Sequence, residues 1–151
     1  MKPYIKSKDY VAASLLMVLN HFDKLELTSD NESRIVNVCS KYDDAVLGSV
    51  LFAKENGLSP SVILPPNDKL DQFNASVLGL DARFMNFGLD DVERFVTDGR
   101  VVILHLDNDK SIVVYDFDSR FLIMDPDYGE MALNKDTLSE KYGIPQRMIL
   151  F

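Results

Sequence analysis

Apolar side chains fill every face of the segment from Lys8 to Phe22, so a helix drawn through it has no polar stripe. A helix that is apolar all round is buried on all sides, and we expect this segment to be the central helix of the protein. Two more helices are predicted, at 31–42 with Ser29 or Asp30 as its cap, and at 43–56, ending before Gly57.

The pattern changes along the rest of the chain. Short strands are predicted at 60–64 and 83–87, with helices at 68–78 and 89–96. Strand-like runs then follow at 101–106, 111–117, 121–124, 130–133 and 147–151, with one helix at 135–142 among them and turns rich in Asp and Gly between them. Helices first and antiparallel strands second predict an α+β fold, in which the N-terminal helices pack on a C-terminal antiparallel sheet.

Length and charge limit the domain organisation and the partners that can be expected. The 151 residues are 46% hydrophobic, which suits a single domain over 1–151 with its own core. Lys and Arg number 16 against 24 Asp and Glu, giving a net charge of −8, the wrong sign for neutralising phosphates. Nucleic acid and membranes are therefore not expected partners. Apart from the apolar helix at Lys8–Phe22, no run approaches the ~20 apolar residues of a membrane span.

Cofactor chemistry finds no support in the sequence. The one cysteine, Cys39, excludes an intrachain disulfide and a zinc site built from several thiolates, and it fits a cytoplasmic location. No glycine-rich phosphate loop is present. The acidic run from Asp125 to Glu130 lacks the ligand spacing of a calcium loop and is predicted to be a hairpin turn. We expect neither a metal nor another cofactor.

A histidine base could come only from His21 or His105. His21 lies near the end of the first predicted helix, and His105 lies inside a predicted central strand. Cys39 falls within a predicted helix, whereas a thiolate is stabilised most at a helix N-terminus. Structural roles are predicted for all three residues, with a nucleophilic Cys39 paired to one of the histidines as the alternative.

Several segments, in order and spacing, resemble one enzyme family. They are the apolar helix Lys8–Phe22 with its Met17-Val18-Leu19 ending, Ala53–Val62, Gly99–Leu106, Ile112–Tyr115, Leu122–Pro126 and Met148–Phe151. Together they resemble the papain-like peptidases that process double-glycine leaders of bacteriocins, family thirty-nine of the cysteine peptidases, over nearly the whole chain. The resemblance implies a papain-like, cysteine proteinase fold with a cleft between its helical and sheet halves.

The nucleophile of that family does not carry over. Its cysteine falls on Tyr10, and the glycine that follows it falls on Val11. The glutamine that helps to bind the oxyanion falls near Tyr4. A phenol, with a reference pKa near ~10, is no substitute for a thiolate at neutral pH.

The base is missing as well. The family histidine falls on Ser111 when its two valines are matched to Val113 and Val114, or on Lys110 if the register differs by one residue. The family's acid is retained as Asp125. The resemblance thus implies a degenerate form without a catalytic set, because losing any member of such a set already costs orders of magnitude in rate.

Some peptide exporters carry a similarly degenerate domain, which implies substrate binding without cleavage. We therefore expect an inactive, peptidase-like protein that binds a peptide or protein segment in the remnant cleft. The residues expected to border that cleft are Tyr4, Tyr10, Val11, Lys110, Ser111 and Asp125.

Alternatives stay open. One is an active hydrolase or acyl transferase that uses Cys39, and another is new chemistry at Tyr10 with Ser111 or Lys110. A third is an acidic interaction or immunity-type protein, whose binding face would be formed by the turns at 107–109, 116–118 and 125–130.

Overall fold

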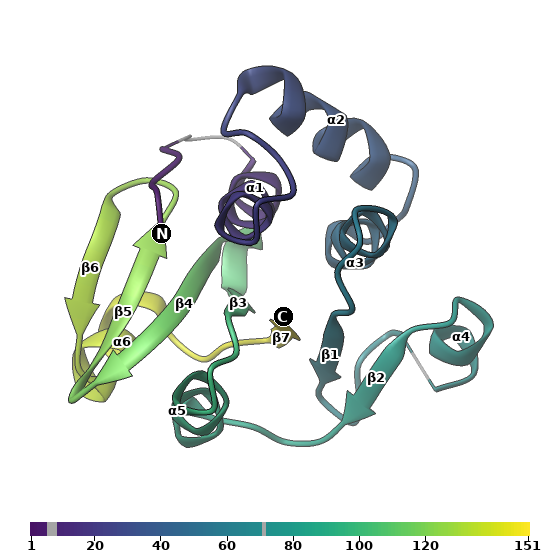
Figure 1. Cartoon of the computed structure of the whole chain (residues 1–151). Helices are drawn as coiled ribbons and strands as arrows, with labels where there is room; N and C mark the ends of the chain where they lie inside the picture. The colour runs from purple at the N-terminus through teal and green to yellow at the C-terminus, as the bar shows by residue number, and fades with distance from the viewer. Residues whose placement is uncertain (6–8, 71) are drawn as a thin grey trace.

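One sheet of seven strands organises the protein, in the order β2-β1-β7-β3-β4-β5-β6 (Figure 1). The computed structural model describes residues 1–5, 9–70 and 72–151. The strands are β1 (Ser61–Leu64), β2 (Asp81–Phe84), β3 (Val102–His105), β4 (Ser111–Asp118), β5 (Arg120–Asp125), β6 (Gly129–Leu133) and β7 (Arg147–Leu150). The helices are α1 (Tyr10–His21), α2 (Ser29–Cys39), α3 (Ala45–Glu55), α4 (Gln72–Val77), α5 (Leu89–Thr97) and α6 (Lys135–Tyr142), with a 3-10 turn η1 (Asp107–Asp109).

Helix α1 is the buried centre that the sequence predicts. Its residues from Val11 to Leu19 are all buried, and it packs on β3 and β4 as well as on α2 and α3. Lys8, where this helix was expected to begin, lies outside the described residues, and the helix begins at Tyr10. The predicted arrangement of N-terminal helices around one central helix on the sheet is confirmed.

Helices cover both faces of the sheet, so there are two apolar cores. Side chains of α1, α2 and α3 pack with Ile103, Val113 and Met124 on one face. Helices α5 and α6 contribute Val92, Val96, Leu138 and Tyr142 to a second core on the opposite face. Figure 1 shows α1–α3 and α5 on opposite sides of the strands.

The sheet is larger than predicted, because β1 and β2 join it. Strand β1 pairs in parallel with β2 and antiparallel with β7, and the remaining neighbours are antiparallel. The last strand therefore lies between the first half of the chain and the second. Pairing of Leu64 with Phe84 also explains why β2 covers Asp81–Phe84 and not the predicted 83–87.

Two helix boundaries differ from expectation for local reasons. Helix α2 is capped by Thr28, whose side chain accepts from the Asn31 N–H at 3.2 Å, and not by Ser29 or Asp30. The predicted helix at 68–78 is reduced to α4, because Asp68 accepts from the Leu70 N–H at 2.9 Å and so forms a turn. That turn leaves the Asp68 carboxylate free to face β7.

Candidate functional site

Tyr10 opens α1 and faces a pocket. The helix begins after Asp9, whose side chain makes no capping hydrogen bond. Tyr10 and Val11 line a pocket of about 440 Å³, together with residues from the end of α2 and the start of α3. The position matched to the family nucleophile therefore lies at the N-terminus of the buried helix, beside a cleft.

Lys110 lies next to Tyr10. Its Nζ is 2.9 Å from Asp127 Oδ2 and 3.3 Å from Asp125 Oδ2. The same ammonium lies 5.5 Å from the ring centroid of Tyr10 and 5.3 Å from that of Tyr128, within the range of cation–π attraction. Burial alone lowers the pKa of Lys110, but the hydrogen bond to Asp127 and the charge of Asp125 outweigh it and raise the pKa above its usual value.

Asp125, at the end of β5, is fully buried and fully engaged. Its Oδ2 accepts from the Tyr142 hydroxyl at 2.5 Å, and its Oδ1 accepts from the Asp127 N–H at 2.7 Å. Burial, followed by the hydrogen bond to Asp125, raises the pKa of Tyr142. The residue that matches the family's acid thus orients Lys110 and a turn.

The Tyr10 phenol holds its proton at neutral pH. Loss of hydration raises its pKa above the usual value, and the charge of Asp127 with a hydrogen bond to it raises the pKa further. With Lys110 also protonated, neither group beside Asp125 can accept a proton.

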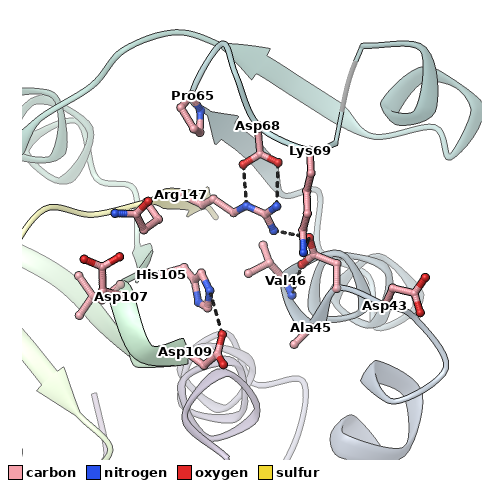
Figure 2. Close-up of a pocket in the computed structure, with 13 residues that line it drawn as sticks. Asp43, Ala45, Val46, Pro65, Asp68, Lys69, His105, Asp107, Asp109 and Arg147 are labelled. Carbon is pink, nitrogen blue, oxygen red and sulfur yellow. Dashed lines mark hydrogen bonds and ion pairs between the residues drawn. The ribbon is translucent and has the colours of Figure 1, made fainter.

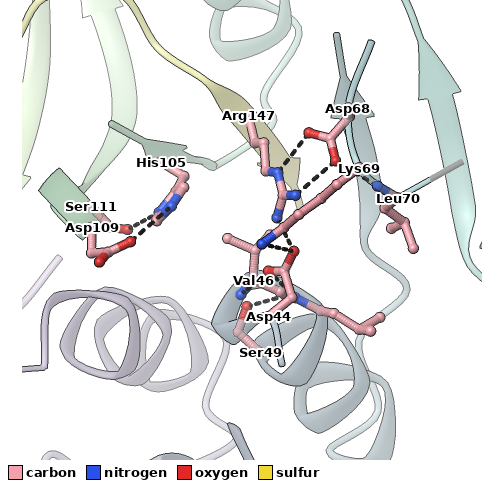
Figure 3. Close-up of polar contacts among 11 residues, drawn as sticks. Asp44, Val46, Ser49, Asp68, Lys69, Leu70, His105, Asp109, Ser111 and Arg147 are labelled. Atoms are coloured by element: carbon pink, nitrogen blue, oxygen red, sulfur yellow. Dashed lines mark hydrogen bonds and ion pairs between the residues drawn. The ribbon is translucent and has the colours of Figure 1, made fainter. Parts of the chain in front are cut away.

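The structure brings Lys110, and not Ser111, to Tyr10. Ser111 is fully buried, and its Oγ lies 3.2 Å from Nδ1 of His105 on the neighbouring strand (Figure 3). Neighbouring residues of a strand point to opposite faces, which separates the two side chains. Lys110 therefore lies in the charged cluster beside Tyr10, and Ser111 lies in a buried site beside His105.

Tyr4 lies away from the cleft. Its ring packs against the core of α1–α3, and it lines neither the Tyr10 pocket nor the pocket beside it. Burial, then a hydrogen bond to Glu32 of α2 and the charge of that residue, raises the pKa of Tyr4 to about 12. The position matched to the oxyanion glutamine thus contacts α2.

A second pocket, of about 460 Å³, adjoins the first (Figure 2). Both are lined by Asp43, Ala45, His105 and Asp109, so together they form one groove along the N-terminal ends of α1 and α3. Burial, followed by the charge of Arg147, lowers the pKa of His105 and keeps its ring neutral at neutral pH. We call this continuous space the α1–α3 groove.

Arg147 forms the inner wall of this groove, and sequence reasoning missed it. Its Nε donates to Asp68 Oδ2 at 2.8 Å and its Nη2 to Asp68 Oδ1 at 2.7 Å, while Nη1 donates to Asp44 (Figures 2 and 3). Asp44 also caps α3 by accepting from the Val46 N–H at 3.0 Å. A charged residue at the start of a buried strand signals a need for carboxylate partners, but the sequence does not say which ones.

Cys39 shares the first pocket with His105, as the alternative hypothesis requires. Burial, with the charge of Asp9, raises the pKa of the Cys39 thiol to about 11. The residue packs tightly, because a Cβ added to Gly48 of α3 would lie 2.7 Å from the Cys39 Cα. His21 is exposed at the other end of α1, against the Phe22 ring.

Among the described residues, no group of three His, Cys, Asp or Glu side chains could hold a metal ion. In the same part of the chain, no helix is long and apolar enough to span a bilayer. The turn at 116–118 lies at the far end of β4 from Lys110, so the three acidic turns do not share one end of the sheet.

No protein-family model matches the chain, and no curated protein matches it. Solved structures do. A double-glycine-motif protease from an AMS/PCAT transporter, determined in complex with the leader peptide, is 18% identical with a TM-score of 0.60, over 98% of this chain and 88% of that one.

A second match is the N-terminal peptidase C39-like domain of a toxin secretion ATP-binding protein from Vibrio parahaemolyticus. It is 12% identical with a TM-score of 0.53, over 95% of this chain and 96% of that one. At such identities the likeness concerns the fold. The chain therefore has the mixed α+β, papain-like fold of peptidase C39 domains.

Proposed function

We propose that this protein is a peptidase-like domain that binds an extended peptide or protein segment in the α1–α3 groove without cleaving it. The observation that carries the proposal is the Lys110 ammonium beside Tyr10, held by Asp125 and Asp127. The raised pKa keeps Lys110 protonated at neutral pH, so this side chain cannot serve as the proton acceptor that a papain-like mechanism needs.

Peptide hydrolysis by this kind of fold requires an activated nucleophile, a base and oxyanion donors. In this chain the Tyr10 phenol and the Lys110 ammonium both keep their protons at neutral pH, since each pKa is raised. Asp125 already binds Lys110 and Tyr142. The scaffold and its cleft are retained, whereas the acid–base pair is replaced by an ion pair.

The groove suits an extended chain. It continues from Tyr10 past the start of α3 to the turn after β1, and it offers side-chain pockets on both sides of His105. Such grooves bind peptides through backbone hydrogen bonds and take specificity from their pockets. A structural neighbour in complex with a leader peptide supports a peptide as the occupant.

A cysteine enzyme using Cys39 is the alternative, favoured by the pocket that Cys39 shares with His105. Against it stands the pKa of about 11, which leaves the thiolate scarce at neutral pH. The neutral His105 ring is held by Ser111. We assign Cys39 to the packing between α2 and α3.

Calorimetric titration tests the proposal, with synthetic peptides that end in a double-glycine motif, followed by mass spectrometry of each peptide. Saturable binding of at least one peptide, recovered intact, is expected. Tyr10→Ala should weaken binding several-fold, whereas Tyr128→Ala, which removes an exposed ring outside the groove, should not. Cleavage of a peptide, or the absence of binding by all of them, would refute the proposal.

A further inference from the structure

Carboxylates dominate the lining of the α1–α3 groove. Six aspartates line it against two basic side chains, Lys69 and Arg147, which leaves four more carboxylates than cations. The aspartates are Asp9, Asp43, Asp44, Asp68, Asp107 and Asp109. His105 adds no charge at neutral pH, because its pKa is lowered.

The two cations are already neutralised by the inner aspartates. Arg147 is held by Asp68 through two hydrogen bonds and by Asp44 through a third. The Lys69 Nζ lies 3.9 Å from the same Asp44. Neither cation is therefore available to compensate the carboxylates at the mouth of the groove.

The outer aspartates have no lysine or arginine partner within the described ranges. Asp43, Asp107 and Asp109 are exposed, and within the described ranges none of them lies within 4.0 Å of a lysine or arginine nitrogen. Figure 2 shows the three around the opening, with Arg147 turned inward to Asp68. The three carboxylates therefore border a space in which Lys69 and Arg147 are already paired with other aspartates.

Apolar surface lies directly beside these charges. The first pocket is lined by Tyr10, Val36, Cys39 and Tyr42 next to Asp43 and Asp109. Long basic side chains pack their methylene stems on apolar surface and keep the charged head at its edge. The groove combines both features along one path.

We propose that the segment bound in the α1–α3 groove is basic, with lysine or arginine stems on the Val36–Tyr42 side and their charges against Asp43, Asp107 and Asp109. This specificity rests on the proposed function, since it names the class of peptide that the groove takes. An acidic peptide meets four more carboxylates than cations there and is excluded.

The test uses three fluorescein-labelled peptides of equal length that carry arginine, glutamine or glutamate at alternate positions, titrated by fluorescence anisotropy. The arginine peptide is expected to bind about tenfold more tightly than the glutamine peptide, and the glutamate peptide not at all. Raising NaCl from about 50 mM to about 300 mM should remove most of that difference.

Two matched double variants locate the effect. Asp43→Asn/Asp109→Asn should weaken binding of the arginine peptide about tenfold and binding of the glutamine peptide much less. Asp116→Asn/Asp118→Asn removes the same charge at the far end of β4 and should change either affinity less than about twofold. All four positions are exposed, so both variants should melt like the wild type.

Equal losses in both variants would show general attraction to an acidic protein and would overturn the assignment of the basic segment to this groove. Arginine and glutamine peptides of equal affinity would also overturn it, and would leave peptide binding itself intact. If none of the three peptides binds, this inference fails, and the titration with double-glycine peptides decides whether the proposed function fails as well.

Discussion

The Lys110 ammonium lies 3.3 Å from the buried carboxylate of Asp125, in the space between that acid and Tyr10. An acid that would orient a histidine in a papain-like peptidase here anchors a lysine. The ion pair neutralises a charge that is fully withdrawn from water. We therefore expect this ion pair to contribute to the stability of the fold.

Lys110→Gln should reduce the free energy of unfolding by about 2–3 kcal/mol, because Asp125 would lose its only basic partner within the described part of the chain. The loss falls at the low end for a buried pair because Lys110 keeps some contact with water. Urea unfolding measures it. Lys141→Gln, at a residue that contacts tyrosine rings, should change stability by less than about 1 kcal/mol, and equal losses would contradict the account.

Arg147→Met should cost about 3–5 kcal/mol, because it leaves Asp44 and Asp68 without their shared guanidinium in a largely buried site. Arg147 joins β7 to the cap of α3 and to the turn after β1, so the loss should appear as a lower melting temperature of the whole fold. Arg120→Met, at an exposed arginine on β5, is the control. A melting temperature equal to that of the control would show that the contacts of Arg147 with Asp44 and Asp68 do not stabilise the fold.

Gly48→Ala should destabilise the protein by about 1–3 kcal/mol, although alanine is the better helix former. A Cβ at this position would lie 2.7 Å from the Cys39 Cα and would force α2 away from α3. Gly88→Ala, where nothing lies within 4 Å of the new Cβ, should lose less than about 1 kcal/mol, because it replaces only the glycine N-cap of α5. Denaturant midpoints distinguish the two, and a stabilised Gly48→Ala protein would contradict the close approach.

His105 should make the protein less stable as the solution is acidified. Burial and then Arg147 lower its pKa in the folded state, so the unfolded chain takes up the proton first. The free energy of unfolding should therefore fall as pH decreases below the unfolded value of about 6.5 and level off below the folded one. Urea unfolding at about pH 7.5 and about pH 5.5 should show a smaller fall in His105→Gln than in His21→Gln. An equal fall in both variants would rule out His105 as the source.

Much of the fold could be predicted, because burial imposes a pattern on the sequence. The run from Val11 to Leu19, apolar except for Ser14, predicts a buried helix, and α6 has the predicted bounds because Asn134 caps it and Gly143 ends it. The pairing of β1 with β7 could not be predicted, because nothing local specifies a partner some 85 residues away.

The residues of the candidate site likewise divide into those that the sequence could identify and those that it could not. Tyr10 and Asp125 were identified by position in a pattern, whereas the choice between Ser111 and Lys110 depended on which face of the sheet each side chain occupies. The ion pairs of Arg147 with Asp44 and Asp68 join three segments that are distant in sequence, so only the folded structure reveals them. Short local patterns in the sequence predict helices and strands, whereas contacts between charged residues that are distant in sequence are known only from the structure.

The most direct test of the central claim is intact-mass analysis after treatment with a broad, thiol-directed peptidase probe at neutral pH. Cys39 is the only cysteine, so the wild type has one thiol that could react. We predict an unlabelled wild-type protein, because the Cys39 pKa of about 11 leaves it a packed thiol, and labelling of Tyr10→Cys at the introduced residue. Stoichiometric labelling of the folded wild type at Cys39 would contradict the account and would make this protein a cysteine enzyme with a relocated nucleophile.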